Sequence, residues 1–189
     1  MADEPLVAPL VAVLAAGRAT RFGGGKLDAD CAGRPLGRWA LDAVAAAGLP
    51  AGMIVTGPNG APWAVGWQKI SNPRPEEGLG TSLALAAHAA LAMDAPALLV
   101  LLADMPLVDP AHLRRLAASA PAATRHPDGR PGVPALLDRA LIEQAARLTG
   151  DRGAGPLLAH APLLDAPPGT LADVDTPEDM AEAVRMLAS

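Results

Sequence analysis

The sequence is poor in the residues that mark several common protein classes. Cys31 is its only cysteine, so the chain cannot form an internal disulfide, and a Cys-rich zinc site is excluded. Aromatic residues make up 2% of the chain and Tyr is absent, so the composition indicates no aromatic-rich interface. A lone thiol fits a reducing cytoplasm, where we expect the protein to reside.

Positive charge and long apolar runs are also scarce. The chain has 15 Lys+Arg against 20 Asp+Glu, and a net charge of -5 does not favour a nucleic-acid backbone as partner. The longest apolar run after the N-terminal one, residues 95–103, is interrupted by Pro96 and is far shorter than a membrane span. The acidic N-terminus does not resemble a signal peptide. We therefore expect neither nucleic acid nor membrane as partner, and the sequence identifies no partner protein or oligomeric state.

Length and patterning predict one α/β domain over residues 1–189. A chain of 189 residues with 51% hydrophobic content can build one core. Apolar runs alternate with helical patterns, which predicts a three-layer Rossmann-like fold with a mainly parallel sheet and helices on both faces. The expected strands are residues 6–14, 53–56, 68–71, 98–103, 121–125, 133–137 and 171–174. The expected helices are residues 36–47, 82–93, 110–118, 138–148 and 177–187.

A glycine-rich loop directly follows the first apolar run and carries positive charge. Because the run reads as a buried parallel strand, the loop leaves the carboxyl edge of the sheet, where ligands bind in open α/β folds. Glycines let backbone N–H groups approach an anion, while Arg18, Arg21 and Lys26 supply charge. The loop is therefore predicted to hold a polyphosphate.

Two common glycine loops do not fit this sequence. A Walker A loop needs glycine six residues before its lysine and Ser or Thr just after, but Thr20 and Leu27 stand there. A dinucleotide fingerprint needs Gly-x-Gly-x-x-Gly straight after the strand, whereas the residues from Gly17 read Gly-Arg-Ala-Thr-Arg-Phe. A third kind of phosphate loop remains.

The segment LAAGRATRFGGGKL, residues 14–27, resembles the opening motif of the MobA-like nucleotidyltransferases, closest to their CTP:molybdopterin cytidylyltransferase branch. Similar motifs follow in the same order at residues 77–83, 102–108, 150–154 and 173–179. The resemblance implies a Mg²⁺-dependent enzyme that moves CMP from CTP onto a phosphorylated acceptor, molybdopterin, and releases pyrophosphate, with GTP as the other possible donor. Residues 1–108 would bind the nucleotide and residues 109–189 the acceptor.

Nucleotidyl transfer brings two anions together, so catalysis depends on positioning and on cations. We expect Lys26 to neutralise the α- or β-phosphate; the alternative is a solvated loop lysine. Arg21 is expected to hold the leaving pyrophosphate, unless it is merely exposed. The resemblance assigns backbone contacts with the nucleotide to the start of the motif: Leu14, Ala15, Ala16 and Gly17, followed by Arg18. Ala16 favours CTP, because the guanylyl branch usually has glycine there.

Two aspartates are candidate Mg²⁺ ligands. Asp104 follows the apolar run 98–103 and so lies at the same sheet edge as the glycine loop, where a metal bridging it to phosphate would explain a carboxylate. A turn or helix cap before Pro106 is the alternative. In the last motif a capping box explains much of the sequence but does not use Asp175, which the resemblance places near the metal. We favour Asp175 over Asp173, and a third alternative is neither.

The glycine turn at residues 77–83 leads into a predicted helix, whose first N–H groups can bind an anion or a base edge. We expect Gly80, Thr81 and Ser82 to contact the base or ribose; the alternative is an ordinary N-cap. Asn72 is a weaker candidate for base recognition and equally suited to forming a turn.

The sequence departs from the family pattern in the half expected to bind the acceptor. Relatives often have His where Val133 stands and Arg where Gly155 stands, and both residue types suit an anionic or pterin-like substrate. A sugar or polyol phosphate is therefore an alternative acceptor, and a non-catalytic protein that binds a nucleotide or molybdenum cofactor is a further alternative function. The four histidines lack metal-ligand spacing, and we expect each to be structural or exposed.

Overall fold

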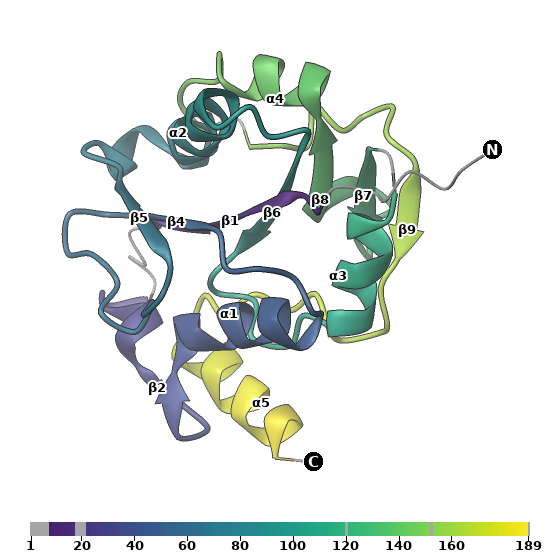
Figure 1. Cartoon of the computed structure of the whole chain (residues 1–189). Helices are drawn as coiled ribbons and strands as arrows, with labels where there is room; N and C mark the ends of the chain where they lie inside the picture. The colour runs from purple at the N-terminus through teal and green to yellow at the C-terminus, as the bar shows by residue number, and fades with distance from the viewer. Residues whose placement is uncertain (1–7, 18–21, 120, 152, 189) are drawn as a thin grey trace.

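A seven-stranded sheet runs through the middle of the structure (Figure 1), a computed structural model that describes residues 8–17, 22–119, 121–151 and 153–188. Its strand order is β5-β4-β1-β6-β8-β7-β9. All neighbours are parallel except at β8, which is antiparallel to both β6 and β7. The strands are β1 Leu10–Ala15, β4 Met53–Thr56, β5 Gln68–Ser71, β6 Ala97–Leu102, β7 Ala122–Arg125, β8 Pro131–Asp138 and β9 Leu163–Asp165.

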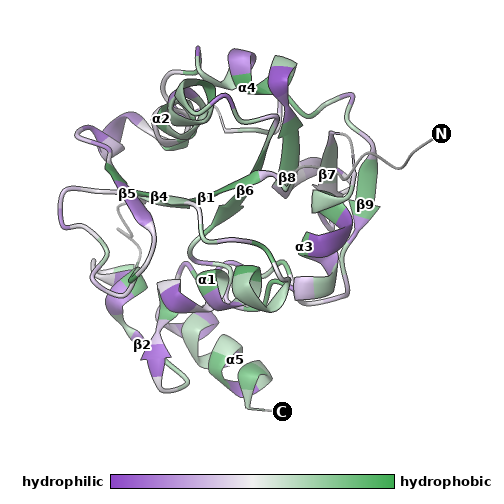
Figure 2. Ribbon diagram, viewed as in Figure 1, coloured by the Kyte–Doolittle hydropathy of each residue, from purple (hydrophilic) through white to green (hydrophobic). Residues whose placement is uncertain are grey.

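The two central strands are apolar along their whole length. β1 reads LVAVLA and β6 reads ALLVLL, and the four middle residues of each are buried. Such continuous runs are typical of parallel strands covered on both faces. Figure 2 shows these strands as the hydrophobic centre of the molecule, with polar residues spread over the helices.

Helices cover both faces of the sheet (Figure 1). On one face lie α2 (Leu79–Ala92) and α4 (Arg139–Ala145), and on the other α1 (Leu36–Ala46) and α3 (Pro110–Ala117), each pair over its own buried cluster. The last helix, α5 (Pro177–Leu187), contacts the small hairpin of β2 (Asp30–Cys31) and β3 (Arg34–Pro35). Two 3-10 turns, η2 (Lys26–Asp28) and η3 (Pro75–Glu77), complete the elements. In the described part of the chain, no helix has the length and apolar character to cross a membrane.

The predicted three-layer α/β fold is confirmed, with two local differences. The strand predicted at residues 171–174 is wrong: Val174 buries its side chain, but its N–H donates to the Asp104 carbonyl instead of joining the sheet. The last strand is β9, parallel to β7. The helix predicted from residue 82 begins at Leu79, because Gly78 takes the N-cap position.

The strand order changes direction beside β1, the feature that places a ligand crevice in open α/β sheets. From β1 the chain crosses to β4 and β5 on one side, and then to β6 on the other. Ligands bind at the carboxyl edge of such a switch point. The glycine loop follows β1 and Asp104 follows β6, so both leave the sheet there.

Candidate active site

The end of the first glycine loop has a backbone shape that depends on glycine. Gly23, Gly24 and Gly25 have φ angles of 89°, 95° and 62°, in the region that residues with a side chain rarely adopt. Gly25 then caps η2, whose first residue is Lys26. Two predicted site residues of this loop, Arg18 and Arg21, lie outside the described residues.

Lys26 turns inward and joins two carboxylates from distant parts of the chain. Its Nζ donates to Asp104 Oδ2 at 2.9 Å and to Asp175 Oδ1 at 3.1 Å. The lysine is only 6% exposed, so it is not a solvated loop residue. The structure thus brings together three of the residues selected from the sequence.

The ion pair with Lys26 does not fully offset the cost of burying the negative charge of Asp104. Burial is the largest effect on Asp104 and raises its pKa, and the charge of Asp173 adds to the rise, while Lys26 opposes it without cancelling it. For Lys26, burial acts to lower the pKa, but the charges and hydrogen bonds of Asp104 and Asp175 together outweigh burial and hold the pKa above its usual value. The lysine therefore stays charged, while the Asp104 carboxylate would be stabilised by a further cation.

One oxygen of Asp104 is available for such a cation. Oδ1 is buried and has no hydrogen-bond partner, the single buried side-chain atom of this kind in the described residues. A buried carboxylate oxygen without a partner is unfavourable. No group of three or more His, Cys, Asp or Glu side chains that could hold a metal occurs within the described ranges. A metal bound at Asp104 would have few carboxylate ligands, and phosphate or water oxygens would supply the others, as is usual for Mg²⁺.

A short extended segment places Asp175 beside Lys26. Val174 is 1% exposed and packs with Cys31 and Leu36, and its N–H bonds to the carbonyl of Asp104. Directly after it, Thr176 and Asp179 form the capping box of α5, as the sequence indicated. Asp175 N–H donates to Asp179 Oδ2 at 3.0 Å, which orients the segment at its other end.

The second glycine turn is held by buried polar contacts. Asn72 is 1% exposed; its amide donates to the hydroxyls of Thr81 at 2.9 Å and Ser82 at 3.0 Å, and its carbonyl accepts from Arg74 N–H. This geometry fits the turn-forming alternative for Asn72. The N–H of Gly80 is already bonded to the carbonyl of Gly150, so it is not open to a ligand here.

A polar pocket of about 260 Å³ adjoins the first glycine loop. We call it the loop pocket. The first glycine loop, the turn after β4, Trp63 and Pro75 form its lining. The residues are Ala15, Ala16, Gly17, Gly24, Gly25, Lys26, Leu27, Asp28, Gly57, Pro58, Asn59, Gly60, Trp63 and Pro75. The predicted nucleotide contacts at residues 15–17 and Lys26 therefore share one pocket.

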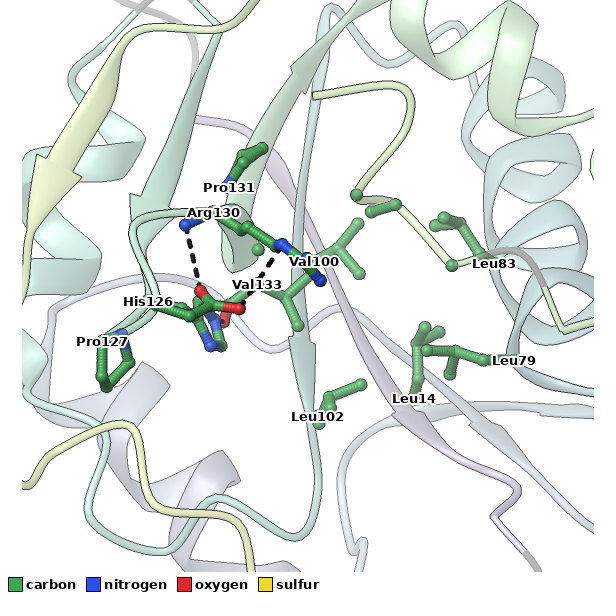
Figure 3. Close-up of a pocket in the computed structure, with 15 residues that line it drawn as sticks. Leu14, Leu79, Leu83, Val100, Leu102, His126, Pro127, Arg130, Pro131 and Val133 are labelled. Atoms are coloured by element: carbon green, nitrogen blue, oxygen red, sulfur yellow. Dashed lines mark hydrogen bonds and ion pairs between the residues drawn. The ribbon is translucent and has the colours of Figure 1, made fainter. Parts of the chain in front are cut away.

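A second, mostly apolar cavity of about 530 Å³ lies between α2 and the hairpin that joins β7 to β8. We call it the hairpin cavity. Figure 3 shows hairpin residues His126, Arg130 and Val133 facing Leu79 and Leu83 of α2 across it. Leu14, Val100 and Leu102 line it from β1 and β6, so Leu14 lies at this cavity while the next residues line the loop pocket.

Sequence reasoning missed residues that only the tertiary fold brings to these pockets. Trp63 lines the loop pocket, and His126 and Arg130 line the hairpin cavity. The Pro/Gly-rich segment between two predicted strands was the available indication of a hairpin. It did not reveal what the hairpin faces.

A glycine loop that ends in a buried lysine, bonded to two aspartates at the switch point of an open α/β sheet, has the groups that nucleotidyl transfer needs. The family comparison agrees: the chain belongs to the MobA-like NTP transferase domain family, whose model matches residues 11–166. No curated protein sequence matches the chain significantly.

Solved structures show the same fold over nearly the whole chain. Rv0371c from Mycobacterium tuberculosis is 28% identical with a TM-score of 0.77, covering 95% of this chain and 99% of its own. The same protein has been solved as a complex with manganese. A nucleotidyl transferase from Methanothermobacter is 23% identical (TM-score 0.78; 95% and 98% covered), and a CMP:2-keto-3-deoxy-manno-octonic acid synthetase complexed with CTP is 14% identical (TM-score 0.72; 96% and 99% covered). The last two support the fold alone.

Proposed function

We propose that this nucleotidyltransferase moves CMP from CTP onto the phosphate of molybdopterin and releases pyrophosphate. The observation that carries the proposal is Asp104, whose Oδ2 is bonded to buried Lys26 while its buried Oδ1 has no partner. Oδ2 is thus bonded to the ammonium group of Lys26, the proposed catalytic cation, whereas Oδ1 is suited to a metal ion. The two substrates would occupy the two pockets at this sheet edge.

The loop pocket is the proposed donor site. Its polar lining and Lys26 suit a triphosphate, and the backbone of residues 14–17 together with Arg18 and Arg21 would contact it. Ala16 lines this pocket, and its methyl group leaves less room than the glycine of the guanylyl branch, which favours the smaller pyrimidine of CTP over GTP. Thr81 and Ser82 would contact the base or ribose through the hydroxyls that Asn72 holds, while Gly80, whose N–H is bonded to the Gly150 carbonyl, would contribute only its Cα.

Mg²⁺ is the proposed metal, with Asp104 as its main ligand and Asp175 as the second. When bound, it would supply charge neutralisation at the phosphates. Asp104 fits this role through its unpartnered Oδ1, and Asp175 fits through its position across Lys26. The manganese complex of Rv0371c is a property of that protein, and it suggests that a divalent metal can be tested here.

The transfer needs no covalent intermediate on the protein. An oxygen of the acceptor phosphate attacks the α-phosphorus of CTP, the bond to the β-phosphate oxygen breaks, and pyrophosphate leaves with the electron pair. Lys26 is charged at neutral pH, since its pKa is raised above the usual value, so it can neutralise charge that grows on the phosphates. Arg21 would hold the pyrophosphate.

The two sites divide the chain unequally. We propose that residues 1–189 act as one domain, with the donor site built from residues 1–108. The acceptor site takes its hairpin from residues 109–189, but Leu14, Leu79 and Leu83 of the first half also line its cavity. We place the reaction in the cytoplasm, because Cys31 is a free, buried thiol.

Pyrophosphate release tests the proposal. The protein is incubated with Mg²⁺, each nucleoside triphosphate and, in turn, molybdopterin, a sugar phosphate or a polyol phosphate. We expect pyrophosphate release only when CTP and molybdopterin are both present. Release with a sugar phosphate or a polyol phosphate would instead identify that compound as the acceptor. Tight nucleotide binding without release from any pair would favour the non-catalytic accessory protein.

A matched pair of variants tests the site itself. Asp104→Asn removes the charge while keeping the shape, and we expect it to abolish most of the release. Asp94→Asn is the control, because this aspartate is exposed and pairs with Arg139 at the far end of β6 from Asp104. Equal activity of both variants would show that the metal site is misassigned.

A further inference from the structure

The polar groups of the hairpin cavity come almost entirely from one turn. Its walls are apolar side chains of β1, β6, α2 and β8, whereas His126, Asp128 and Arg130 of the β7–β8 hairpin supply the polar side chains. The Arg130 side chain is 84% exposed and pairs with Asp128 at 3.7 Å, so its charge is partly balanced and it stands at the rim. His126 is half-buried and is therefore the polar group best placed against a ligand inside the cavity.

The contacts of His126 define which ring atom a ligand can use. Its Nε2 lies 2.9 Å from the carbonyl oxygen of Val133. A carbonyl oxygen only accepts, so Nε2 carries the hydrogen and donates it. Nδ1 has no hydrogen-bond partner in the described part of the chain. In this tautomer Nδ1 accepts, and it would take an N–H or O–H from a ligand.

The backbone beneath the ring is shaped for it. A Cβ added at Gly132 would lie 2.5 Å from Nε2 and 2.6 Å from Cδ2 of His126, closer than real contacts allow. Thr124 of β7 pairs with Gly132 of β8, and His126, just after the end of β7, places its imidazole over this glycine. Where the family pattern has a histidine, this chain has Val133, and the same hairpin supplies the imidazole of His126 from the turn after β7 instead.

We propose that His126 is a specificity-determining residue of the acceptor site and accepts a hydrogen bond at Nδ1 from the edge of a planar heteroaromatic acceptor ring. This inference rests on the proposed function, because it takes the hairpin cavity as the acceptor site. The apolar walls Leu14, Val100 and Val133 suit the faces of a flat ring. A polyol would bury several hydroxyls against these walls without partners, which is unfavourable.

Binding without turnover tests this role. A fluorescent pterin phosphomonoester and glycerol 3-phosphate are titrated separately into the protein in the absence of nucleotide and metal. We expect the pterin to bind and His126→Ala to weaken it about tenfold, the effect of one lost hydrogen bond to a neutral group. His160→Ala is the control, since His160 is exposed and lines neither pocket; its affinity should match the wild type. Preferential binding of glycerol 3-phosphate would overturn the proposal.

A ring-retaining variant separates the hydrogen bond from packing. His126→Phe keeps a flat ring over Gly132 and removes both nitrogen atoms, so it should lose pterin affinity as His126→Ala does, while its melting temperature falls only by the loss of the Nε2 hydrogen bond to Val133. A double variant, His126→Val with Val133→His, returns the imidazole to the position of the family pattern and should recover most of the affinity. Wild-type affinity in His126→Phe would overturn the proposal.

Kinetics distinguish this inference from the proposed function. If the wild type transfers CMP to molybdopterin, His126→Phe should raise the KM for the acceptor about tenfold and leave the KM for CTP unchanged. A raised KM for CTP alone would mean that His126 belongs to the donor site. If the wild type transfers to no acceptor, the proposed function fails, while the pterin titration still decides the role of His126.

Discussion

The loop pocket and the hairpin cavity lie at one sheet edge but are built in different ways. The loop pocket, about 260 Å³, is formed mainly by glycines, short side chains and one buried lysine, so its character comes from the backbone and from charge. The hairpin cavity, about 530 Å³, is formed mainly by leucine, valine and hairpin side chains from separate elements. The difference suggests that the donor site depends on the shape of one loop, whereas the acceptor site depends on how distant elements pack.

The largest expected effect is the loss of the Lys26 charge beside the donor phosphates in the loop pocket. Lys26→Ala should lower kcat for transfer by about 10²–10³-fold with any acceptor, the usual size of a lost preorganised electrostatic contact. Lys69→Ala changes the other lysine of the chain, which is exposed on β5, and should have no effect on kcat. Steady-state kinetics compare them, and thermal unfolding monitors the fold, because the substitution leaves half-buried Asp104 without its main partner. Full activity of Lys26→Ala would contradict the assignment of the loop pocket as the donor site.

Two buried leucines on opposite faces of the sheet test the hairpin cavity. Leu83 and Leu113 are 1% and 0% exposed, and each change to Ala should lower the free energy of unfolding by about 3 kcal/mol. Only Leu83 lines the cavity, so only Leu83→Ala should alter the KM for the acceptor while leaving the KM for CTP as it was. Denaturant unfolding and initial-rate kinetics measure the two effects. An equal shift of acceptor KM in Leu113→Ala would mean that lost stability, not cavity shape, is responsible.

Two glycines with positive φ angles test the loop pocket in the same way. Gly24 and Gly33 have φ angles of 95° and 85°, and an added Cβ would meet no other atom within 4 Å at either position. Each change to Ala should therefore cost about 1–2 kcal/mol of stability through backbone strain. Gly24 lines the loop pocket and Gly33 does not, so only Gly24→Ala should raise the KM for CTP. Unchanged CTP binding in Gly24→Ala would contradict the donor assignment.

The smallest expected effect concerns α3, on the face of the sheet opposite the hairpin cavity, and its response to acid. His112 is buried, and burial followed by the nearby Arg115 charge lowers its pKa below 6.5. Thr124 donates its hydroxyl hydrogen to the Pro134 carbonyl, so His112 Nε2 donates to Thr124 while Nδ1 accepts from Arg115. A second proton on the His112 ring, at Nδ1, would lie against the positive charge of Arg115.

The pH at which this contribution is lost follows from the direction of the shift. Folding favours neutral His112, so its contribution to stability is complete above pH 6.5 and is lost as the pH falls below 6.5 towards the folded-state pKa. The melting temperature should decline over this range, and the decline should be shallower in His112→Gln. The same slope in both proteins would assign the acid response to other groups.

Much of the fold was predictable because its central strands and helices have strong local patterns. The apolar runs of β1 and β6 and the helical spacing of α1 are visible in the sequence, and the structure confirms the three-layer arrangement. The error at residues 171–174 has a physical reason: Val174 is buried by a tertiary contact with the Asp104 backbone, and burial of one apolar residue resembles a short strand.

The candidate site was predictable where its residues belong to motifs and not where packing selects them. Lys26, Asp104 and Asp175 were identified from the sequence, and the structure joins them through one buried ammonium group. Asn72 instead bonds to Thr81 and Ser82, because a buried amide must satisfy its hydrogen bonds with whatever the fold brings near. His126 could not be selected, since its partner Val133 and the opposite cavity wall come from different elements.

The sequence by itself determined the fold class and the residues with the charge and glycine content for nucleotidyl transfer, since these depend on local patterns. Only the tertiary structure decided that Asp104 has one oxygen bound to Lys26 and the other without a partner, and that His126 lines the hairpin cavity. Burial and hydrogen bonding between distant segments depend on how whole elements pack, and no single segment contains that information.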